Sequence, residues 1–326
     1  FIVEARGRRA PRNRGLAMRG QRTLALSRRY RNCPRRRPGT SLASFQSGWA
    51  WFAETGQEQG VLQIMISAGR AGTLRPSDMD ALFDRMLEQV DEAKEWLGEG
   101  VTRTEGVRVR DATAYLHRAP IEDRIIRVGD AAYGIDPLSG HGIFEAVGGA
   151  MAAAPVVNTL LSRPESAEVA AGYYADRARQ AFLQHARVGR DFYRSEERWA
   201  EGSFWASRSG WPDDEPAHGG VLGRLPRIRR QPVIEDGFIE CREVIVTKEH
   251  PRGVRFIDGV PLVEVIDRID GLKPFPGTES AARDLGLPAK NLAAAIDWLR
   301  RQKVVTGDGD KIIVSAARLR ENGKAP

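Results

Sequence analysis

The chain has 326 residues, of which 41% are apolar and 29% charged, and its formal net charge is +7 at pH 7. This composition excludes a disordered chain and predicts two or three globular units. The charge is local, because residues 1–40 carry thirteen arginines and one acid, Glu4, while the rest of the chain is net negative. A solvated face or an acidic partner explains such a segment as readily as nucleic acid does.

The cysteine content and the hydropathy of the sequence indicate the cellular compartment. Cys33 and Cys241 are the two cysteines, far apart in sequence, so we expect neither a disulfide framework nor a metal site, and a reducing environment. The longest apolar run, "AVGGAMAAAPVVNTLL", is interrupted by Pro155 and falls short of the roughly 18 residues that span a bilayer. These features predict a soluble, cytoplasmic protein with no membrane partner.

The N-terminal segment opens on "FIVEARGRRAP", an apolar run with neither an initiator Met nor a signal-peptide pattern. Residues 1–40 are expected to hold one strand followed by an Arg-rich irregular stretch. Because the strand begins at the first residue, we expect an N-terminal portion to precede it.

The next block alternates strand and helix patterns. Residues 42–54 and 60–68 are apolar and aromatic runs flanking a polar turn, which predicts antiparallel strands. A helix is expected from Pro76 to Gly98, with Ser77 as its N-cap, and a further strand over 107–117. This block should form a sheet with a helix packed on it.

Residues 124–146, "RIIRVGDAAYGIDPLSGHGIFEA", combine a short strand, a Gly-rich loop and the start of a helix near Gly142. Such a unit presents unpaired backbone N–H groups and the positive end of a helix dipole, which favours an anion or a polar ring. Gly140 and Gly142 would let a ligand approach the backbone, and Pro137 stiffens the loop. Asp130, at the strand end, can accept hydrogen bonds from a polyol hydroxyl.

The remainder of the chain is helical and then mixed. Residues 170–200 predict a long helix that braces the preceding domain, and a Trp- and Gly-rich connector follows. Beyond it, strand patterns, three helices and a hairpin near Gly307 predict a winged-helix arrangement. Its third helix lacks a basic stripe, which favours protein docking or a structural role over specific binding of nucleic acid.

The Gly-rich segment resembles the second flavin-binding motif of the FAD-dependent monooxygenase, halogenase and geranylgeranyl-reductase superfamily. The resemblance covers residues 1 to about 200, and within the superfamily the chain resembles the monooxygenases that mature the tryptophylquinone cofactor of quinohaemoprotein amine dehydrogenase. It implies that the aspartate holds a ribityl hydroxyl of FAD and that the helix start meets the N1–C2=O edge of the isoalloxazine ring. The implied FAD-binding residues are Gly129, Asp130, Pro137, Gly140, His141, Gly142 and Ile143.

Two further segments carry the resemblance. "VEARGR", from Val3 to Arg8, is similar to the family strand near the adenosine half of FAD, although Glu4 and Arg6 depart from its pattern. "GWAWF" is similar to the Trp-x-Trp-x-Ile-Pro signature of tryptophan halogenases, with Phe-Ala in place of Ile-Pro. Trp49 and Trp51 are therefore candidate substrate-side residues, with burial in the core as the equal alternative.

A strand followed by G-x-G-x-x-G, which holds the FAD pyrophosphate in this fold, is absent from the 326 residues. Two explanations stay open: the chain is the C-terminal part of an enzyme, or it has lost the cofactor.

The resemblance implies α/β and α+β architecture, with a partial FAD-binding domain that is Rossmann-like and of glutathione-reductase type, an antiparallel-sheet substrate region and a C-terminal winged-helix-like domain. The expected boundaries are 1–40 for the partial FAD-binding domain, 41–120 for the substrate-side sheet and helix, 121–215 for the continuation of the FAD-binding domain with its helical extension, and 216–326 for the winged-helix-like domain.

The implied function is an FAD-dependent monooxygenase that hydroxylates an aromatic, tryptophan-like substrate, small or protein-bound, through a flavin C4a-hydroperoxide. Reduced nicotinamide or a partner reductase would supply the electrons. The alternatives are a flavin-dependent halogenase or reductase on the same fold, and a non-enzymatic winged-helix binding protein.

Overall fold

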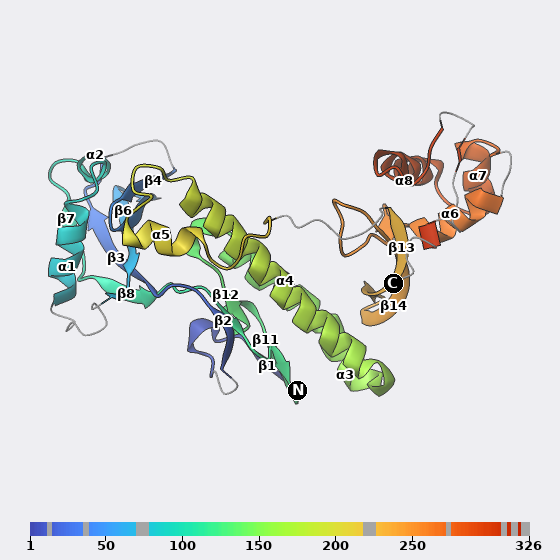
Figure 1. Cartoon of the computed structure of the whole chain (residues 1–326), viewed down its shortest axis with the longest axis horizontal. Coiled ribbons are helices and arrows are strands. Elements are labelled where there is room, and N and C mark those ends of the chain that lie inside the picture. Colours follow the sequence, from blue (N-terminus) through green and yellow to red (C-terminus); the bar gives the residue numbers. More distant parts are fainter. Residues whose placement is uncertain are drawn as a thin grey trace. The chain divides into compact units, whose positions relative to one another are not determined.

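The computed structural model describes residues 1–11, 15–34, 39–69, 78–217, 226–271, 275–307, 312–313 and 319–320. The chain forms two compact units. Unit 1 comprises Phe1–Ala153 and Tyr174–Ala217, and unit 2 comprises Ala154–Tyr173 and His218–Pro326. Helices α3 (Gly142–Ser162) and α4 (Ala167–Arg194) contribute residues to both units (Figure 1).

The largest sheet of unit 1 is antiparallel, with strand order β4-β5-β6-β3-β7 and with β8 also paired to β3. Alternating apolar residues of its central strands point into cores on both faces of the sheet. The predicted antiparallel strands are confirmed, but the first predicted run holds two strands, which turn at residues 46–47. The strands are β3 (Thr23–Arg31), β4 (Thr40–Phe45), β5 (Gly48–Gly56), β6 (Gln59–Ser67), β7 (Thr102–Arg103) and β8 (Arg108–Asp111).

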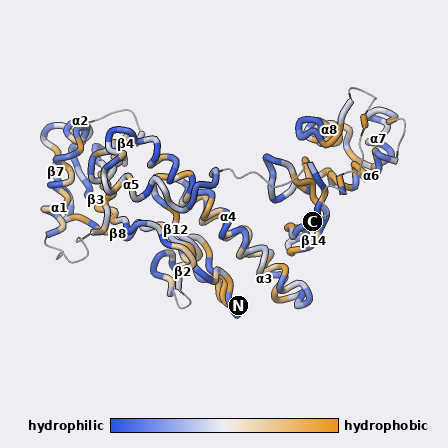
Figure 2. Tube along the Cα trace, in the orientation of Figure 1, coloured by the Kyte–Doolittle hydropathy of each residue, from blue (hydrophilic) through white to orange (hydrophobic). Residues whose placement is uncertain are grey.

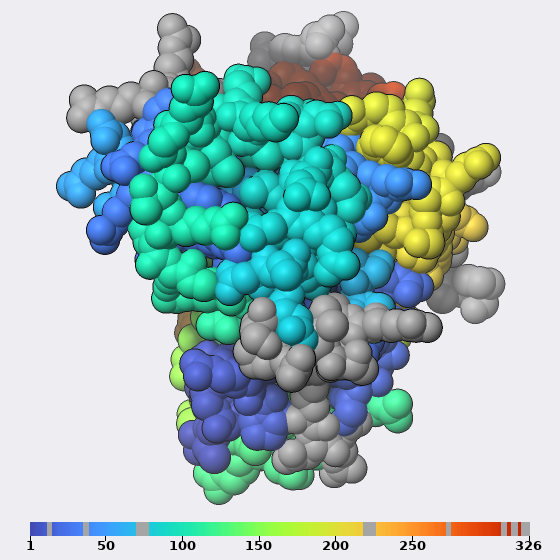
Figure 3. Space-filling model, turned by 90° about the vertical axis from the view of Figure 1, so that its left-hand side faces the viewer, coloured from blue at the N-terminus to red at the C-terminus, as the bar shows by residue number. Residues whose placement is uncertain are grey.

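Two short helices, α1 (Asp78–Leu87) and α2 (Ala93–Leu97), cover one face of this sheet (Figure 3). The prediction of one continuous helix to Gly98 is wrong. The chain turns between the helices so that Val90 enters the core and Trp96 stacks on Phe52, with ring centroids 6.3 Å apart. The turn between the helices brings Phe83 of α1 and Trp96 of α2 into the same core. Pro76 and the expected cap Ser77 lie outside the described residues.

The Arg-rich segment contains more regular structure than expected. Residues 1–40 hold strands β1 (Ile2–Glu4), β2 (Leu16–Arg19) and β3, so the prediction of a single strand is wrong. Arg28 of β3 is fully buried and donates to the carboxylates of Asp80, at 2.6 Å, and Asp84 of α1. Because these carboxylates neutralise the guanidinium, an arginine can occupy the middle of a sheet.

Two small sheets connect the main sheet to the helices. In the first sheet, β11 (Ile125–Arg127) pairs in parallel with β1 and antiparallel with β10 (Ile121–Glu122). In the second sheet, β9 (Tyr115–His117) lies between β2 and β12 (Tyr133–Gly134). The strand predicted over 107–117 is therefore two strands, β8 and β9, in different sheets. The Asp111 carboxylate accepts a hydrogen bond from the Thr113 backbone N–H at 2.9 Å, which turns the chain between them.

Three further helices follow the small sheets in the chain, and the first two are shared with unit 2. α3 contains Pro155 without ending there, and by length and composition it could cross a membrane, contrary to the expectation that no apolar run is long enough. α4 ends at Arg194, earlier than predicted. The predicted connector contains α5 (Ser203–Ser209), because Phe204 and Trp205 pack into the core.

Unit 2 is built on the hairpin β13 (Arg227–Glu235) and β14 (Phe238–Val246), followed by β15 (Phe256–Ile257) and β16 (Val260–Pro261). The three predicted helices are α6 (Leu262–Gly271), α7 (Thr278–Leu285) and α8 (Ala289–Arg301), packed around one apolar core. Thr306 and Ile313 form an antiparallel bridge, while the expected hairpin turn at 308–311 lies outside the described residues.

Candidate functional site

The Gly-rich segment folds as a strand, two tight turns and a helix. β11 ends at Arg127, and a 3₁₀ turn over Gly129–Ala131 carries Asp130. After β12, a second 3₁₀ turn runs over Pro137–Ser139 and leads into α3. The Asp136 side chain caps this turn by accepting the Leu138 backbone N–H at 2.9 Å, and Pro137 takes the first position, where its missing N–H costs nothing.

Two glycines of this segment have distinct roles. Gly129 has φ +55°, and a Cβ there would lie 3.0 Å from the Ala146 Cβ, so glycine lets α3 approach the turn closely. Gly140 has φ +69°, and no heavy atom lies within 4 Å of the Cβ position. Together with exposed Gly142, it leaves the backbone at the start of α3 open to a ligand.

Asp130 is oriented by Arg8. The Arg8 Nε lies 3.2 Å from Asp130 Oδ2, and its Nη1 donates to the Thr113 carbonyl at 2.7 Å. The Asp130 side chain stays 40% exposed, so its carboxylate is accessible to a hydroxyl donor. The parallel pairing of β1 with β11 brings together the two segments that carry the resemblance.

The two arginines of the segment from Val3 to Arg8 have different partners. Arg6 binds Glu4, and this hydrogen bond lowers the pKa of Glu4 to about 2. Arg8 instead reaches Asp130, and its guanidinium lies 5.2 Å from the Tyr115 ring. Only Arg8 of this pair is therefore placed to act on the Gly-rich segment.

His141 and Ile143 lie at the open start of α3. His141 is exposed, its Nδ1 contacts the Ser139 carbonyl, and its ring centroid is 5.0 Å from that of His185. Ile143 is 85% exposed and shares one helix face with other exposed apolar residues, and β1 also exposes apolar side chains. Figure 2 gives the hydropathy of these residues along the Cα trace. These residues are Phe144, Val147 and Met151 on α3, and Ile2 and Val3 on β1.

The two candidate tryptophans occupy different environments. Trp49 is 2% exposed, packs with Met65 and Phe204, and donates its Nε1–H to the Tyr193 hydroxyl at 3.3 Å. Trp51 is half-buried and donates to Gln63 Oε1 at 2.8 Å. Trp49 thus has the core position that the sequence left open as the alternative, and a substrate contact for either residue stays a prediction.

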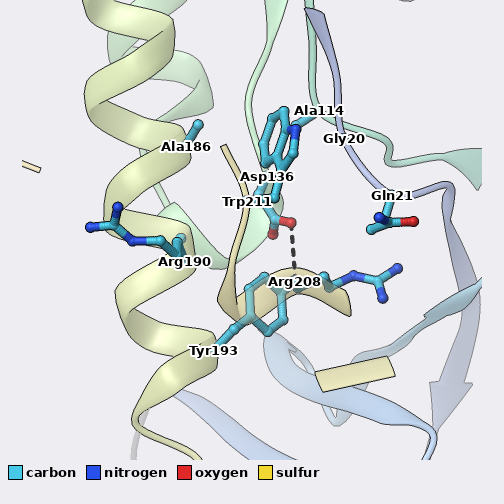
Figure 4. A pocket seen from close by; sticks show the side chains of 10 residues that line it. Gly20, Gln21, Ala114, Asp136, Ala186, Arg190, Tyr193, Arg208 and Trp211 are labelled. Carbon is cyan, nitrogen blue, oxygen red and sulfur yellow. Dashed lines mark hydrogen bonds between the residues drawn. The ribbon is translucent and has the colours of Figure 1, made fainter. Parts of the chain in front are cut away.

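A buried network joins the sheet to the Gly-rich segment. Figure 4 shows the Asp136 carboxylate, which accepts the Tyr193 O–H at 3.0 Å, beside a cavity of about 20 Å³. Tyr193 also receives the Trp49 N–H, so a hydrogen-bond chain runs from β5 through α4 to the turn before α3. Burial raises the pKa of Asp136 and of Tyr193, and lowers the pKa of nearby Arg208.

Sequence reasoning missed these network residues. Asp136 was detectable, because an Asp-Pro pair before a helix is a capping signal. The contact of Tyr193 with Asp136 and that of Arg208 with Thr23 have no local signal, since each joins residues more than fifty positions apart.

Comparison with known proteins identifies the family. No protein-family model matches the chain, and no curated protein matches it. Among solved structures, the peptidyl tryptophan dihydroxylase QhpG, described as essential for tryptophylquinone cofactor biogenesis, is 33% identical, with a TM-score of 0.73. The match covers 93% of this chain and 68% of QhpG. The chain belongs to the FAD-dependent monooxygenase and halogenase-like superfamily.

Two halogenase structures share the fold. The myxobacterial chondrochloren halogenase CndH is 24% identical over 64% of this chain and 50% of its own, with a TM-score of 0.56. The flavin-dependent halogenase CmlS is 18% identical over 97% of this chain and 70% of its own, with a TM-score of 0.62. Family membership confirms the predictions of an FAD-dependent oxidoreductase and of mixed α/β architecture with antiparallel sheets. The Rossmann-like and winged-helix assignments stay predictions.

Proposed function

We propose that the chain serves FAD-dependent hydroxylation of a tryptophan-like side chain carried on a protein or peptide. The supporting observation is the identity of 33% to a peptidyl tryptophan dihydroxylase, over 93% of this chain. The accessible Asp130 carboxylate and the open backbone at the start of α3 are compatible with FAD, because they offer a hydroxyl acceptor and helix N–H donors on one strand–turn–helix unit.

The residues of the segment take complementary roles in this proposal. Asp130 would accept a hydrogen bond from a ribityl hydroxyl of FAD, and Arg8 holds its carboxylate in place. The Gly140 N–H already donates to the Pro137 carbonyl at 3.0 Å, so Gly140 would leave space for the ring. Of the three predicted donors, His141 and Gly142 would offer their N–H groups to the N1–C2=O edge of the ring. Gly129 lets α3 pack against the turn, Pro137 fixes the loop, and Ile143 presents an apolar side chain beside it. FAD, when bound and reduced, supplies the activation of O₂, with electrons from reduced nicotinamide or a partner reductase.

Hydroxylation is favoured over halogenation by strand β5. Phe52 and Ala53 stand where the halogenase signature has Ile-Pro, and Phe52 packs on Trp96 in the core. We therefore propose that oxygen and reduced FAD suffice, with no halide requirement. Halogenation or simple reduction by the same fold are the alternatives.

The proposal of a protein substrate does not depend on the positive charge of the N-terminal segment. Several of its arginines pair with acids of the chain itself, namely Arg8 with Asp130, Arg28 with Asp80 and Arg29 with Glu105. We propose that the helices of unit 2 form a winged-helix-like docking or structural domain, and that the protein is cytoplasmic. In this proposal the protein recognises an aromatic side chain on a protein substrate and does not bind nucleic acid sequence-specifically.

The test is product analysis with the full-length protein. A tryptophan-containing peptide, reduced FAD and O₂ are incubated with and without chloride or bromide, and the products are analysed by mass spectrometry. Oxygen incorporation that is independent of halide supports the proposal. A halogenated product refutes it, and reoxidation of FAD without a modified peptide favours the reductase alternative.

A further inference from the structure

A second polar cluster lies at the start of α3, outside the residues so far assigned. Glu145, in the first turn of α3, accepts the Tyr133 O–H at 2.7 Å through Oε2. Its Oε1 lies 3.0 Å from His185 Nε2 on α4. The cluster therefore joins β12, α3 and α4 through one carboxylate.

The carboxylate of this cluster is ionised and largely buried. The hydrogen bond from His185, followed by that from Tyr133, lowers the pKa of Glu145 to about 2. Arg177 of α4 adds a favourable charge. A negative charge therefore sits within the first turn of the helix whose N–H groups face the open space at Gly140.

His185 links this charge to the exposed segment. Its ring is buried and lies 5.0 Å from the His141 ring, at an interplanar angle of 32°. Among the described residues its Nδ1 has no hydrogen-bond partner, so Glu145 is the one side chain that fixes the ring by a hydrogen bond. The arrangement orients His185 beside His141 and gives the ionised Glu145 carboxylate a ring N–H donor.

A bare carboxylate here would repel an anion at the helix start, whereas a carboxylate whose charge is partly taken up by the hydrogen bond from His185 leaves the dipole and the N–H groups more available. We propose that the Glu145–His185 pair sets the charge at the start of α3 and thereby the ease with which flavin bound there is reduced. The inference rests on the proposed function. Glu145 and His185 are positioning residues, because they act through the electrostatics of the helix start and through His141.

The experiment compares E145Q, H185Q and the double variant with the wild-type full-length protein. E145Q removes the negative charge and should shift the ratio of reduced to oxidised bound FAD about tenfold toward reduced at a fixed potential. H185Q removes the strongest of the interactions that stabilise the carboxylate, leaving Tyr133 and Arg177, and should shift the ratio in the opposite direction, with the double variant near E145Q. Reduction is followed by equilibrium titration with a redox dye.

The matched control is D176N. Asp176 is an exposed carboxylate on the same helix α4, nine residues before His185 and thus about 13 Å along the axis. This variant should leave the ratio unchanged. Shifts of the same sign in E145Q and H185Q, or no shift in either, would overturn the inference while leaving FAD binding intact.

A measurement without flavin tests the pair itself. In a double-mutant cycle on urea unfolding, the two single variants should be non-additive, because each removes the same hydrogen bond. Additive effects contradict the pair. If the wild-type protein retains no FAD, both the proposed function and the inference fail. If the protein retains FAD but the variants leave the ratio of reduced to oxidised FAD unchanged, only the inference fails.

Discussion

Two charged clusters of unit 1 differ in where their charge is accessible. Arg28 on β3 is 0% exposed, and both of its carboxylate partners belong to α1. Asp130 pairs with Arg8 but stays 40% exposed at the mouth of a Gly-rich turn. The first cluster fastens a helix to a sheet, while the second leaves a carboxylate for a ligand. Burial, more than residue type, separates a structural charge from a binding charge.

The largest expected effect lies in the buried cluster. Arg28→Ala should lower the free energy of unfolding by about 3 kcal/mol, because it removes the packing on Phe83 and both buried ion pairs, leaving Asp84 with Arg103 and Asp80 with the Val107 N–H. Urea unfolding followed by circular dichroism measures this. The control is Arg29→Ala on the same strand, where a 63% exposed side chain and a surface ion pair predict less than about 1 kcal/mol. Equal losses would show that burial does not distinguish the two arginines.

Two glycines of the Gly-rich segment, which carries Asp130, test whether packing or ligand access explains each glycine. Gly129→Ala should cost about 2 kcal/mol of unfolding free energy, because it combines a positive φ with a contact of 3.0 Å to Ala146. Gly140→Ala faces open space and should cost only the backbone strain, about 1 kcal/mol. Thermal unfolding of both variants checks the difference. A larger loss in Gly140→Ala contradicts the packing argument.

Acid should weaken the start of α3. Since the folded pKa of Glu145 is lowered to about 2 from an ordinary value of 4.5, its contribution is present above pH 4.5 and is lost as pH falls from there toward 2. Wild-type unfolding free energy should therefore fall more steeply across this range than that of Glu145→Gln. Parallel slopes for the two proteins would contradict an ionised Glu145.

The smallest expected effect concerns unit 2. The exposed side chains of α8 include Asp297 beside Arg300, so duplex DNA should bind weakly, without sequence preference, and less as salt rises. Fluorescence anisotropy at two salt concentrations measures this. Nanomolar, sequence-specific binding would instead favour the non-enzymatic alternative.

Local signals predicted the Gly-rich segment well, since glycine, proline and a capping aspartate act within a few residues. The three helices of unit 2 were predicted from apolar spacing for the same reason. Strand β3 was missed because its arginines favour solvent until Asp80 and Asp84 neutralise Arg28, and those partners lie more than fifty residues away. The Glu145–His185 pair is likewise invisible in the sequence, because only the packing of α3 on α4 forms it.

The most direct test of the central claim, that the exposed carboxylate of the Gly-rich turn serves FAD, is a calorimetric titration of the full-length protein with FAD. Asp130→Ala should weaken binding by about 1.5–3 kcal/mol, the range for a hydrogen bond to a charged group, with little change in unfolding. Asp80→Asn, in the buried cluster, should leave the affinity unchanged. Unaltered FAD affinity in Asp130→Ala, or equal losses in both variants, would contradict the account.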